Sequence, residues 1–353
     1  PVVGHARRAG SEVLGELELG WRLVPNEFIA VTGTNGKTTT VELIGAMHRA
    51  AGAPVAVAGN VGTPVSSLAG AIEPAATVVC EASSFQLEDS VAFAPEAAVF
   101  LNFAPDHLDR HATETAYRDA KLRIFANQGP SDVAVVSETL PGAPATVRFG
   151  AGSDCEMRFD GQRLVWRGDP LIDTSEVRLR GRHNLDNAMA AAAVCLERGL
   201  SAGAVRAALR DFPGVPHRLE TVVEVDGVLY VNDSKATNVS AAVRALESFG
   251  DGVHAILGGS LKGGGFAGLA PAVAGRCVAC YLIGEAAARL AEDLRATGVE
   301  QVRSGDLEHA VREAARRARP GEVVLLAPAC ASFDQYRDFE ERGEHFRALV
   351  HAL

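Results

Sequence analysis

Short apolar runs alternate with amphipathic segments over residues 28–137. The strands predicted from this pattern are 28–32, 55–58, 77–81, 97–102 and 132–137. Helical patterns such as 37–50 and 113–127 lie between several of them. This alternation of strands and helices predicts a parallel sheet that is covered by helices on both faces.

The pattern changes at residues 146–180, where VRFG, CEMRFD, RLVWRG and SEVRLRG predict short, exposed β pieces. Helices are predicted again at 184–198 and 202–211. Segment 212–218 is rich in Pro and Gly, so we predict a domain boundary there.

A second alternation of strands and helices follows that boundary. Its predicted elements are the strands 228–232, 253–257, 278–283 and 323–327 and a last helix at about 335–349. The chain is therefore expected to hold two α/β domains in series. The length of 353 residues suits about two domains.

The composition narrows the function classes. A net charge of −10 argues against nonspecific binding to nucleic acid or anionic membranes, which needs a basic surface. Six cysteines in so long a chain do not make a disulfide framework, so a cytoplasmic location is expected. Of the 34 cationic residues four are lysines, namely Lys37, Lys121, Lys235 and Lys262, and each is expected to mark a place where a guanidinium group cannot replace the amine.

The segment IAVTGTNGKTTTVELIGAMHRA runs from an apolar strand through a Gly-rich turn into an amphipathic helix. Backbone N–H groups in such a turn bind phosphate, Lys37 adds a positive charge, and the Thr38 hydroxyl suits Mg²⁺. The general phosphate-loop pattern has Gly where this chain has Val31, and Gly33 stands two residues later, so the loop is a shortened variant. An ordinary glycine turn is the alternative, but the order strand, Gly-Lys-Thr, helix favours nucleotide binding.

Polar residues also follow other predicted strands at the same edge of the sheet. Glu81 ends the third strand, and Asp106 and His107 follow the fourth. A carboxylate and an imidazole there would complete a Mg²⁺ site beside ATP. The alternatives are a solvated strand end and a polar loop. His111 lies four residues after His107, but at the entry to a helix, so helical spacing of two metal ligands is not assured.

Lys121 shares one helical face with the apolar residues Tyr117, Ile124 and Phe125, so its side chain is expected to point toward the core. A lysine there either extends its amine to solvent or has a lowered pKa and a reactive neutral amine.

Three polar segments follow strands of the second domain and predict a second binding edge. They are NDSKATN (232–238), GGSLKGGG (258–265) and PACASFDQYRDFEERG (328–343). The motif CVAC (277–280) has redox-like spacing, but residues three apart in a strand point to opposite faces, so a structural pair is predicted.

The motifs TGTNGKTT, EASSFQLE, DHLDRH, YRDAKLRIF, GRHNLDNAMAA, PHRLE, NDSKATN and PACASFDQ resemble those of the Mur ligases over nearly the whole chain. NDSKATN and PACASFDQ are similar to the member of that family that adds D-glutamate to UDP-N-acetylmuramoyl-L-alanine. The resemblance implies an ADP-forming amide ligase of peptidoglycan synthesis. In that family a substrate carboxylate is phosphorylated by ATP, and an amine attacks the acyl phosphate.

The resemblance also implies the roles of individual residues. The residues expected to bind ATP are Gly33, Thr34, Asn35, Gly36, Lys37, Thr38, Thr39, Asn187, Arg218, Asp233 and Lys235. Two Mg²⁺ ions are expected on Thr38, Glu81, His107 and Lys121, the last as a CO₂-derived carbamate; Lys37, Glu81, His107 and Lys121 form the implied catalytic set. The residues expected to bind the other substrates are Asn60, Thr237, Lys262, Ser332, Phe333 and Phe339.

The resemblance divides the chain into residues 1–20, which resemble the end of a connection from a preceding domain, a central ATP-binding domain (21–214) and a Rossmann-like domain that binds D-glutamate (215–353). The expected fold is α/β, with a P-loop-type, mostly parallel central sheet and a small β extension. The family's first domain, which holds the UDP group, has no counterpart in this sequence. Either a truncated chain or a natural two-domain form is expected.

Two other functions remain open from the sequence. One is another Mur or folylpolyglutamate-type amide ligase, against which NDSKATN and PACASFDQ argue. The other is a noncatalytic nucleotide-binding fragment. For the ligase we expect small-molecule substrates, a monomer, no nucleic acid and no membrane insertion.

Overall fold

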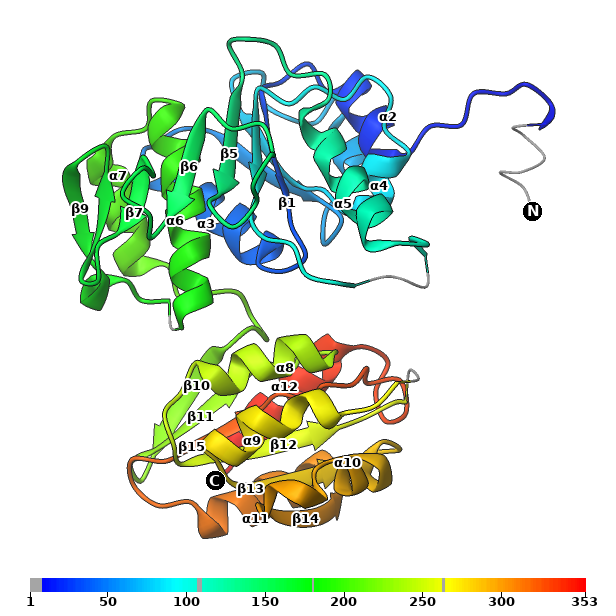
Figure 1. The fold of residues 1–353 in the computed structure, drawn as a ribbon, viewed down its shortest axis with the longest axis vertical. Helices are drawn as coiled ribbons and strands as arrows, with labels where there is room; N and C mark the ends of the chain where they lie inside the picture. Colours follow the sequence, from blue (N-terminus) through cyan, green and yellow to red (C-terminus); the bar gives the residue numbers. More distant parts are fainter. Residues whose placement is uncertain (1–7, 107–109, 180, 262–263) are drawn as a thin grey trace. The chain divides into compact units, whose positions relative to one another are not determined.

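The computed structural model describes residues 8–106, 110–179, 181–261 and 264–353, so His107 and Lys262 lie outside the described residues. The chain divides into two compact units, and Pro213–Leu353 make up nearly all of the second. Each unit has a mostly parallel sheet with helices on both faces, which confirms the α/β fold predicted from the sequence (Figure 1).

Among the described residues, nine strands form the sheet of the first unit, in the order β2-β3-β1-β4-β5-β6-β7-β8-β9. They are β1 (Phe28–Thr32), β2 (Val55–Gly59), β3 (Thr77–Glu81), β4 (Ala97–Phe100), β5 (Val133–Ser137), β6 (Val147–Gly150), β7 (Met157–Phe159), β8 (Arg163–Trp166) and β9 (Asp169–Asp173). Neighbouring strands in this order are parallel from β2 to β7. The β7–β8 and β8–β9 pairs are antiparallel, and these three strands form the small β extension.

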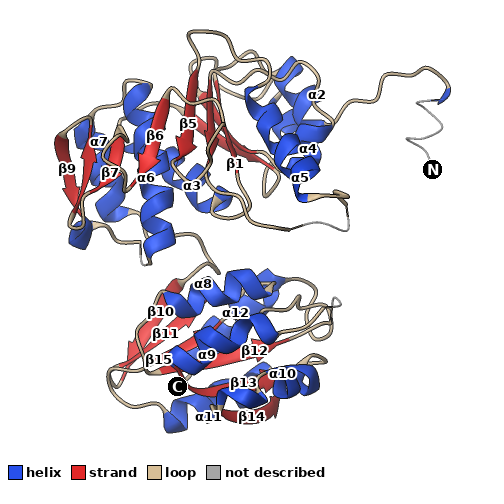
Figure 2. Ribbon diagram, in the orientation of Figure 1, coloured by secondary structure: helices blue, strands red, loops and turns tan. Residues whose placement is uncertain are grey.

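Helices pack on both faces of this sheet (Figure 2). They are α2 (Glu16–Leu23), α4 (Ser84–Glu88) and α5 (Glu114–Leu122) on one face and α3 (Lys37–Ala50), α6 (Arg182–Glu197) and α7 (Ala202–Asp211) on the other. Short 3₁₀ turns are η1 (Val65–Leu68), η2 (Arg123–Phe125) and η3 (Thr174–Glu176). Leu17 of α2 and Ile124 pack with Phe28 and Phe100 in one fully buried core.

The described strands of the second unit form a sheet in the order β10-β11-β15-β12-β13-β14, parallel except for the β10–β11 hairpin. They are β10 (Glu220–Val225), β11 (Val228–Asn232), β12 (Val253–Gly258), β13 (Cys277–Ile283), β14 (Glu300–Gly305) and β15 (Val323–Leu326). The helices are α8 (Val239–Glu247), α9 (Ala270–Arg276), α10 (Ala287–Asp293), α11 (Leu307–Arg317) and α12 (Phe339–His351), with 3₁₀ turns η4 (Ala267–Leu269) and η5 (Arg295–Thr297).

One apolar cluster covers each face of that sheet. One lies under α8, α9 and α10, and the other lies under α11 and α12. No helix in the described parts of either unit combines the length and apolar character that a membrane crossing needs.

Several predicted elements were wrong in detail. Residues 175–179 of the segment SEVRLRG do not form a strand, because β9 forms earlier, where Asp169–Asp173 pairs antiparallel with β8. β6 is largely buried rather than exposed, since it lies inside the sheet between β5 and β7. The last helix begins at Phe339 because the Asp338 side chain caps it by accepting the Glu341 N–H.

Candidate active site

The loop between β1 and α3 is shaped to receive an anion. Gly36 is the N-cap of α3 with a φ of 87°, and as a glycine it has no side chain with which to cap that helix. A Cβ on Gly36 would collide with the Asn187 side chain of α6. The loop therefore brings backbone N–H groups and the positive end of a helix to one place, as phosphate binding requires.

Residues outside the glycine motif hold this loop. Asn102, just after β4, accepts the Asn35 N–H on Oδ1 at 3.0 Å and donates from Nδ2 to the Asn35 carbonyl at 3.0 Å. The Thr34 hydroxyl donates to the Ala104 carbonyl and accepts the Ala104 N–H. Asn102 is not among the predicted site residues, although a polar residue at the end of the predicted strand 97–102 was a usable signal.

Changing Gly36 to Ala is expected to lower Mg-ATP affinity at least about tenfold, because left-handed φ and a steric collision each cost about 1 kcal/mol or more. Gly52→Ala is the matched control, since Gly52 also has a positive φ, 67°, but open space around its Cβ position. Titration calorimetry with Mg-ATP checks this. Equal affinities of the two variants would contradict the close fit of the loop.

Glu81 is a buried carboxylate at the end of β3, beside the loop. Its Oε2 accepts the Thr38 hydroxyl at 2.7 Å, and its Oε1 accepts the Asn60 side-chain amide at 3.1 Å. Both donors are neutral, so these two hydrogen bonds bring no cation onto the carboxylate. A hydroxyl and a carboxylate are hard oxygen ligands, so this pair fits Mg²⁺.

The described residues contain no group of three or more His, Cys, Asp or Glu side chains arranged to hold a metal ion. His107, the imidazole expected in this site, is outside the described ranges. The fit for a metal therefore rests on Thr38 and Glu81.

Two lysines converge on the same loop carbonyl. Lys37 Nζ donates to the Gly33 carbonyl at 3.0 Å, and Lys121 Nζ donates to it at 2.8 Å. Lys121 is 1% exposed, which confirms the prediction that it points toward the core. Burial, followed by the nearby Lys37 charge, lowers the pKa of Lys121 to about 7, although Asp106 and Glu81 oppose this. A large fraction of neutral amine is therefore present near neutral pH.

An aromatic cluster encloses Lys121. Its Nζ lies 4.5 Å from the centre of the Tyr117 ring, and Tyr117 packs on His111 at 5.2 Å between centroids. His111 is buried, stacks on Phe85 and shares a 3.0 Å hydrogen bond with the Ser84 hydroxyl. This histidine therefore supports the wall behind Lys121, a role that no sequence spacing indicated.

In the second unit, Asp233 follows β11 directly and is 6% exposed. Its Oδ1 accepts the Leu219 N–H at 3.0 Å. Burial raises the pKa of Asp233 to about 6, while the Arg218 charge acts in the opposite direction. Arg218 Nε is buried without a hydrogen-bond partner among the described residues, and Lys235 Nζ lies 5.3 Å from the Phe339 ring centre.

Asp233→Asn is expected to stabilise the protein more at about pH 8 than at about pH 5. The folded-state pKa is raised, so the folded state holds the proton longer and the wild type loses stability as pH rises from 3.8 to about 6. Asparagine still accepts the Leu219 N–H but has no charge to bury. Thermal unfolding at both pH values measures this. A melting-temperature difference that is the same at both values would show that Asp233 does not titrate in this range.

A buried arginine, Arg342, joins the loops of the second binding edge. Its guanidinium donates to the Ser234 hydroxyl and carbonyl at 2.9 and 2.8 Å. It also donates to the Ala331 and Cys330 carbonyls at 3.2 Å. Arg342 therefore fixes the loop after β11 against the loop after β15. It was not predicted as a site residue, because its partners are one hydroxyl and three backbone carbonyls that only the fold brings to it.

The remaining predicted site residues lie as follows. Ser332 is 2% exposed, Phe333 is 71% exposed, and Thr237 is partly buried just before α8. Asn187 is buried in α6, where its amide donates to Asn184 Oδ1 at 3.0 Å. Asn60 is exposed, while its neighbour Gly59 is buried and so close to the Glu81 backbone that a Cβ would not fit.

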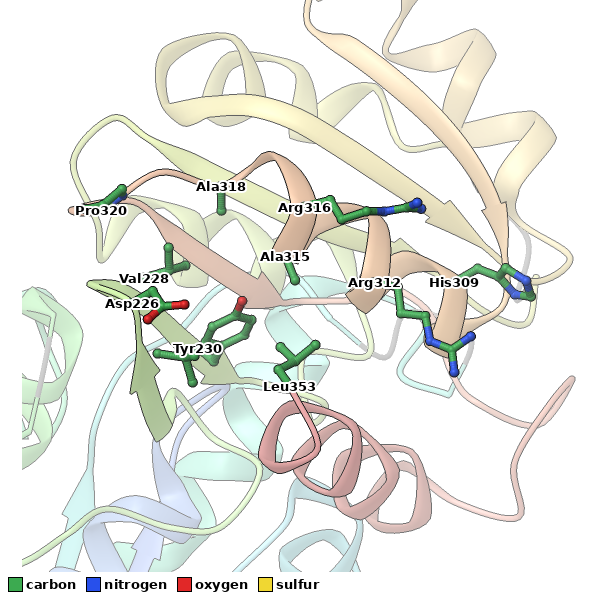
Figure 3. Close-up of a pocket in the computed structure, with 11 residues that line it drawn as sticks. Asp226, Val228, Tyr230, His309, Arg312, Ala315, Arg316, Ala318, Pro320 and Leu353 are labelled. Atoms are coloured by element: carbon green, nitrogen blue, oxygen red, sulfur yellow. The ribbon is translucent and has the colours of Figure 1, made fainter.

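A pocket in the second unit lies away from the second binding edge (Figure 3). Tyr230, Arg312 and Leu353 are among its lining residues. It lies beside the β10–β11 turn, at the end where β11 begins, whereas Asp233 follows the end of that strand. None of the predicted site residues lines it.

Comparison with known proteins gives matches along most of the chain. The family model of the Mur ligase middle domain matches residues 31–195, and that of the Mur ligase glutamate ligase domain matches residues 217–330. UDP-N-acetylmuramoylalanine–D-glutamate ligase of Pelotomaculum thermopropionicum is 43% identical over 99% of this chain and 80% of its own length. The ligase of the same name from Geobacter metallireducens is 44% identical over 100% of this chain and 80% of its own length.

Solved structures agree on the fold. UDP-N-acetylmuramate-alanine ligase of Thermotoga maritima has a TM-score of 0.71 at 19% identity, covering 94% of this chain and 77% of its own. MurF ligase of the same organism, solved in complex with ADP, has a TM-score of 0.69 at 18% identity, covering 95% of this chain and 83% of its own.

Proposed function

The chain belongs to the Mur ligase family, and on this premise we propose that it joins D-glutamate to UDP-N-acetylmuramoyl-L-alanine with conversion of ATP to ADP and phosphate. The reaction is a step of peptidoglycan precursor synthesis. One structural observation supports it most: the phosphate loop, a buried carboxylate and a buried lysine of lowered pKa lie together.

ATP is proposed to bind with its phosphates on the backbone of the 33–39 loop. Lys37 already points back over that loop and would place its charge on the phosphates. One buried polar atom of this unit supports the arrangement, Thr39 Oγ1, because it has no hydrogen-bond partner among the described residues. Asn187 is proposed to contact the adenine, and Arg218, Asp233 and Lys235 are proposed to complete the ATP site.

Magnesium is proposed at two positions. Thr38 and Glu81 would hold one ion, and His107 with carbamylated Lys121 would hold the other. Bound there, the ions supply positive charge to the phosphoryl group as it is transferred. Among the described ligands, Glu81 contributes a full charge and Thr38 orients it through their hydrogen bond.

Lys121 is proposed to react with CO₂ as a neutral amine. The nitrogen lone pair bonds to the carbon, one proton leaves, and a carbamate replaces the ammonium group. Its burial and its pKa of about 7 support this step, because an ordinary surface lysine is almost fully protonated at neutral pH. Arginine has no comparable neutral form.

The chemical steps need no covalent nucleophile from the protein. The substrate carboxylate attacks the γ-phosphorus of ATP and releases ADP. The amine of D-glutamate then attacks the acyl phosphate and expels phosphate. The chain itself contributes positioning and charge. Lys37 and the loop N–H groups stabilise the negative charge on the phosphoryl oxygens during the transfer.

Six residues are proposed to bind the remaining substrates. Asn60, whose amide already contacts Glu81, would contact the sugar-peptide substrate near the metal. Thr237, Lys262, Ser332, Phe333 and Phe339 would form the D-glutamate pocket. Arg342 supports that pocket, since it ties the Ser234 and Ala331 backbones together. The six cysteines are all free in the structure, and we propose a cytoplasmic location on that basis.

Lys262→Ala is expected to raise the KM for D-glutamate at least about tenfold, because a charge-assisted hydrogen bond to a carboxylate is worth about 1.5–3 kcal/mol. The KM for ATP should change much less. Initial-rate kinetics with each substrate varied in turn separates the two. An unchanged D-glutamate KM would remove Lys262 from the pocket.

The function itself is tested by incubating the protein with Mg-ATP, UDP-N-acetylmuramoyl-L-alanine and each of several amino acids. We expect ADP release and a ligated product with D-glutamate, and neither with L-glutamate or L-lysine. A product with a different amino acid would point to another amide ligase of the family. ADP release without any ligated product would contradict the proposal.

A further inference from the structure

The cysteines of the CVAC motif lie on the same face of the sheet, contrary to the sequence prediction. In the pairing of β12 with β13, Cys277 lies opposite Val253, and Cys280 lies opposite Ala255. The register shifts between these pairs, so Val278 is an extra residue in a β-bulge. Because residues two apart on β12 share a face, their two cysteine partners share it as well.

Burial agrees with the register. Cys280 and Leu282 lie in the apolar cluster under α8, α9 and α10, and Cys277 packs against that same cluster. Val278, which regular alternation would place in this cluster, is 47% exposed. The prediction that the cysteines point to opposite faces is therefore wrong, and the bulge is the physical reason.

The bulge also shortens the distance between the two residues. The register places them two residues of strand rise apart rather than three, for which a Cα–Cα distance of about 6.6 Å is expected, within the upper range for a disulfide. A side-chain hydrogen bond with Cys277 raises the pKa of Cys280 well above its ordinary value, and burial acts in the same direction. The shared sheet face and the shared apolar cluster place the two side chains side by side, and Cys280 is held as a thiol.

Access to the two thiols is unequal. Cys277 is partly exposed and lines a surface pocket together with Gly252, Gly275 and Gly321. Cys280 is fully buried behind it. A small reagent in solvent therefore meets Cys277 first.

We propose that Cys277 and Cys280 form a redox-reactive pair, in which a peroxide oxidises Cys277 and Cys280 closes an intramolecular disulfide. The Cys277 sulfur attacks one peroxide oxygen, the O–O bond breaks, and a sulfenic acid and water (from hydrogen peroxide) result. The Cys280 sulfur then attacks the Cys277 sulfur, the S–O bond breaks, and the departing hydroxide takes the Cys280 proton as water. In total, two thiols are oxidised and one peroxide is reduced to two waters.

The test treats the reduced full chain with hydrogen peroxide, blocks remaining thiols with iodoacetamide and maps peptides by mass spectrometry. The peptide with both cysteines is expected to lose the mass of two hydrogens, reversibly with dithiothreitol. Cys155→Ser, a control outside the pair, should leave this unchanged. Absence of the 277–280 disulfide in the wild-type protein would overturn the proposal.

Two variants separate the roles of the thiols. Cys280→Ala, which keeps a small apolar side chain in the core, should stop at a sulfenic acid on Cys277 that dimedone traps. Cys277→Ser should make Cys280 unreactive toward peroxide in the folded protein. Oxidation of Cys280 in that variant at the wild-type rate would overturn the assignment of Cys277 as the entry thiol. Phenylarsine oxide, which bridges adjacent thiols, should bind the wild type and neither variant, so the adjacency is also measured without an oxidant.

Discussion

Lys121→Ala is expected to lower the ligation rate at least about 10³-fold, because the lost carbamate removes several kcal/mol of metal-dependent charge stabilisation. The lysine is buried, its amine contacts the Gly33 carbonyl, and its pKa is lowered to about 7. A short carboxylate such as acetate is expected to enter the space that the side chain leaves. Added acetate or propionate is therefore expected to restore part of the rate.

Two control variants make this result specific. Lys121→Arg keeps a cation but forms no carbamate and fills the space, so it should be inactive and should not respond to acetate. Asp119→Ala changes an exposed residue of the same helix and should be nearly fully active. Near-normal activity of Lys121→Ala at saturating substrate would contradict the carbamate assignment.

Glu81→Gln is expected to lower the ligation rate strongly while leaving the stability of the protein nearly unchanged. The glutamine oxygen still accepts the Thr38 hydroxyl, and the exposed Asn60 amide can turn its oxygen toward the new NH₂ group, so the free energy of unfolding should stay within about 1 kcal/mol of wild type. The rate should fall at least about 10²-fold, because the magnesium site loses its buried negative charge. Thermal unfolding and a Mg²⁺ titration of the ligation rate measure the two effects.

The matched control for Glu81→Gln is Glu88→Gln, which removes an exposed carboxylate that pairs with Arg110. That variant should keep its Mg²⁺ dependence, since a surface ion pair contributes little. An unchanged Mg²⁺ requirement in Glu81→Gln would exclude this carboxylate as a metal ligand.

Local sequence pattern accounted for the elements around the phosphate loop. The predicted strand 28–32 and helix 37–50 have the bounds of β1 and α3, because a wholly buried parallel strand is a continuous apolar run and the helix follows a glycine turn. The pattern did not reveal β14. Its residues EQVRSG are polar because β14 is an edge strand, so burial did not demand an apolar run.

The predicted orientation of the cysteines in β13 was wrong for a different reason, the bulge in that strand. Alternation along one strand assumes regular pairing, whereas the face of Cys277 depends on its register with β12. Register is a relation between two segments and cannot be read from one of them. The same reasoning from a single segment succeeded for Lys121, because a helix face is set by the helix alone.

The residues of the candidate site also divide into those that the sequence could place and those that it could not. Residues at strand ends, such as Glu81 and Asp233, could be placed near ligand-binding edges from the sequence. Asn102, His111 and Arg342 could not be assigned, since each acts through contacts with distant residues or backbone carbonyls. The resemblance to the Mur ligases supplied roles that geometry alone would leave open.

The central claim is that the chain forms an amide through an acyl phosphate made from ATP. It is tested most directly with UDP-N-acetylmuramoyl-L-alanine whose carboxylate carries heavy oxygen, in the presence of Mg-ATP and D-glutamate. We predict that one heavy oxygen appears in the released phosphate for each amide formed. Release of unlabelled phosphate during amide formation would contradict the claim.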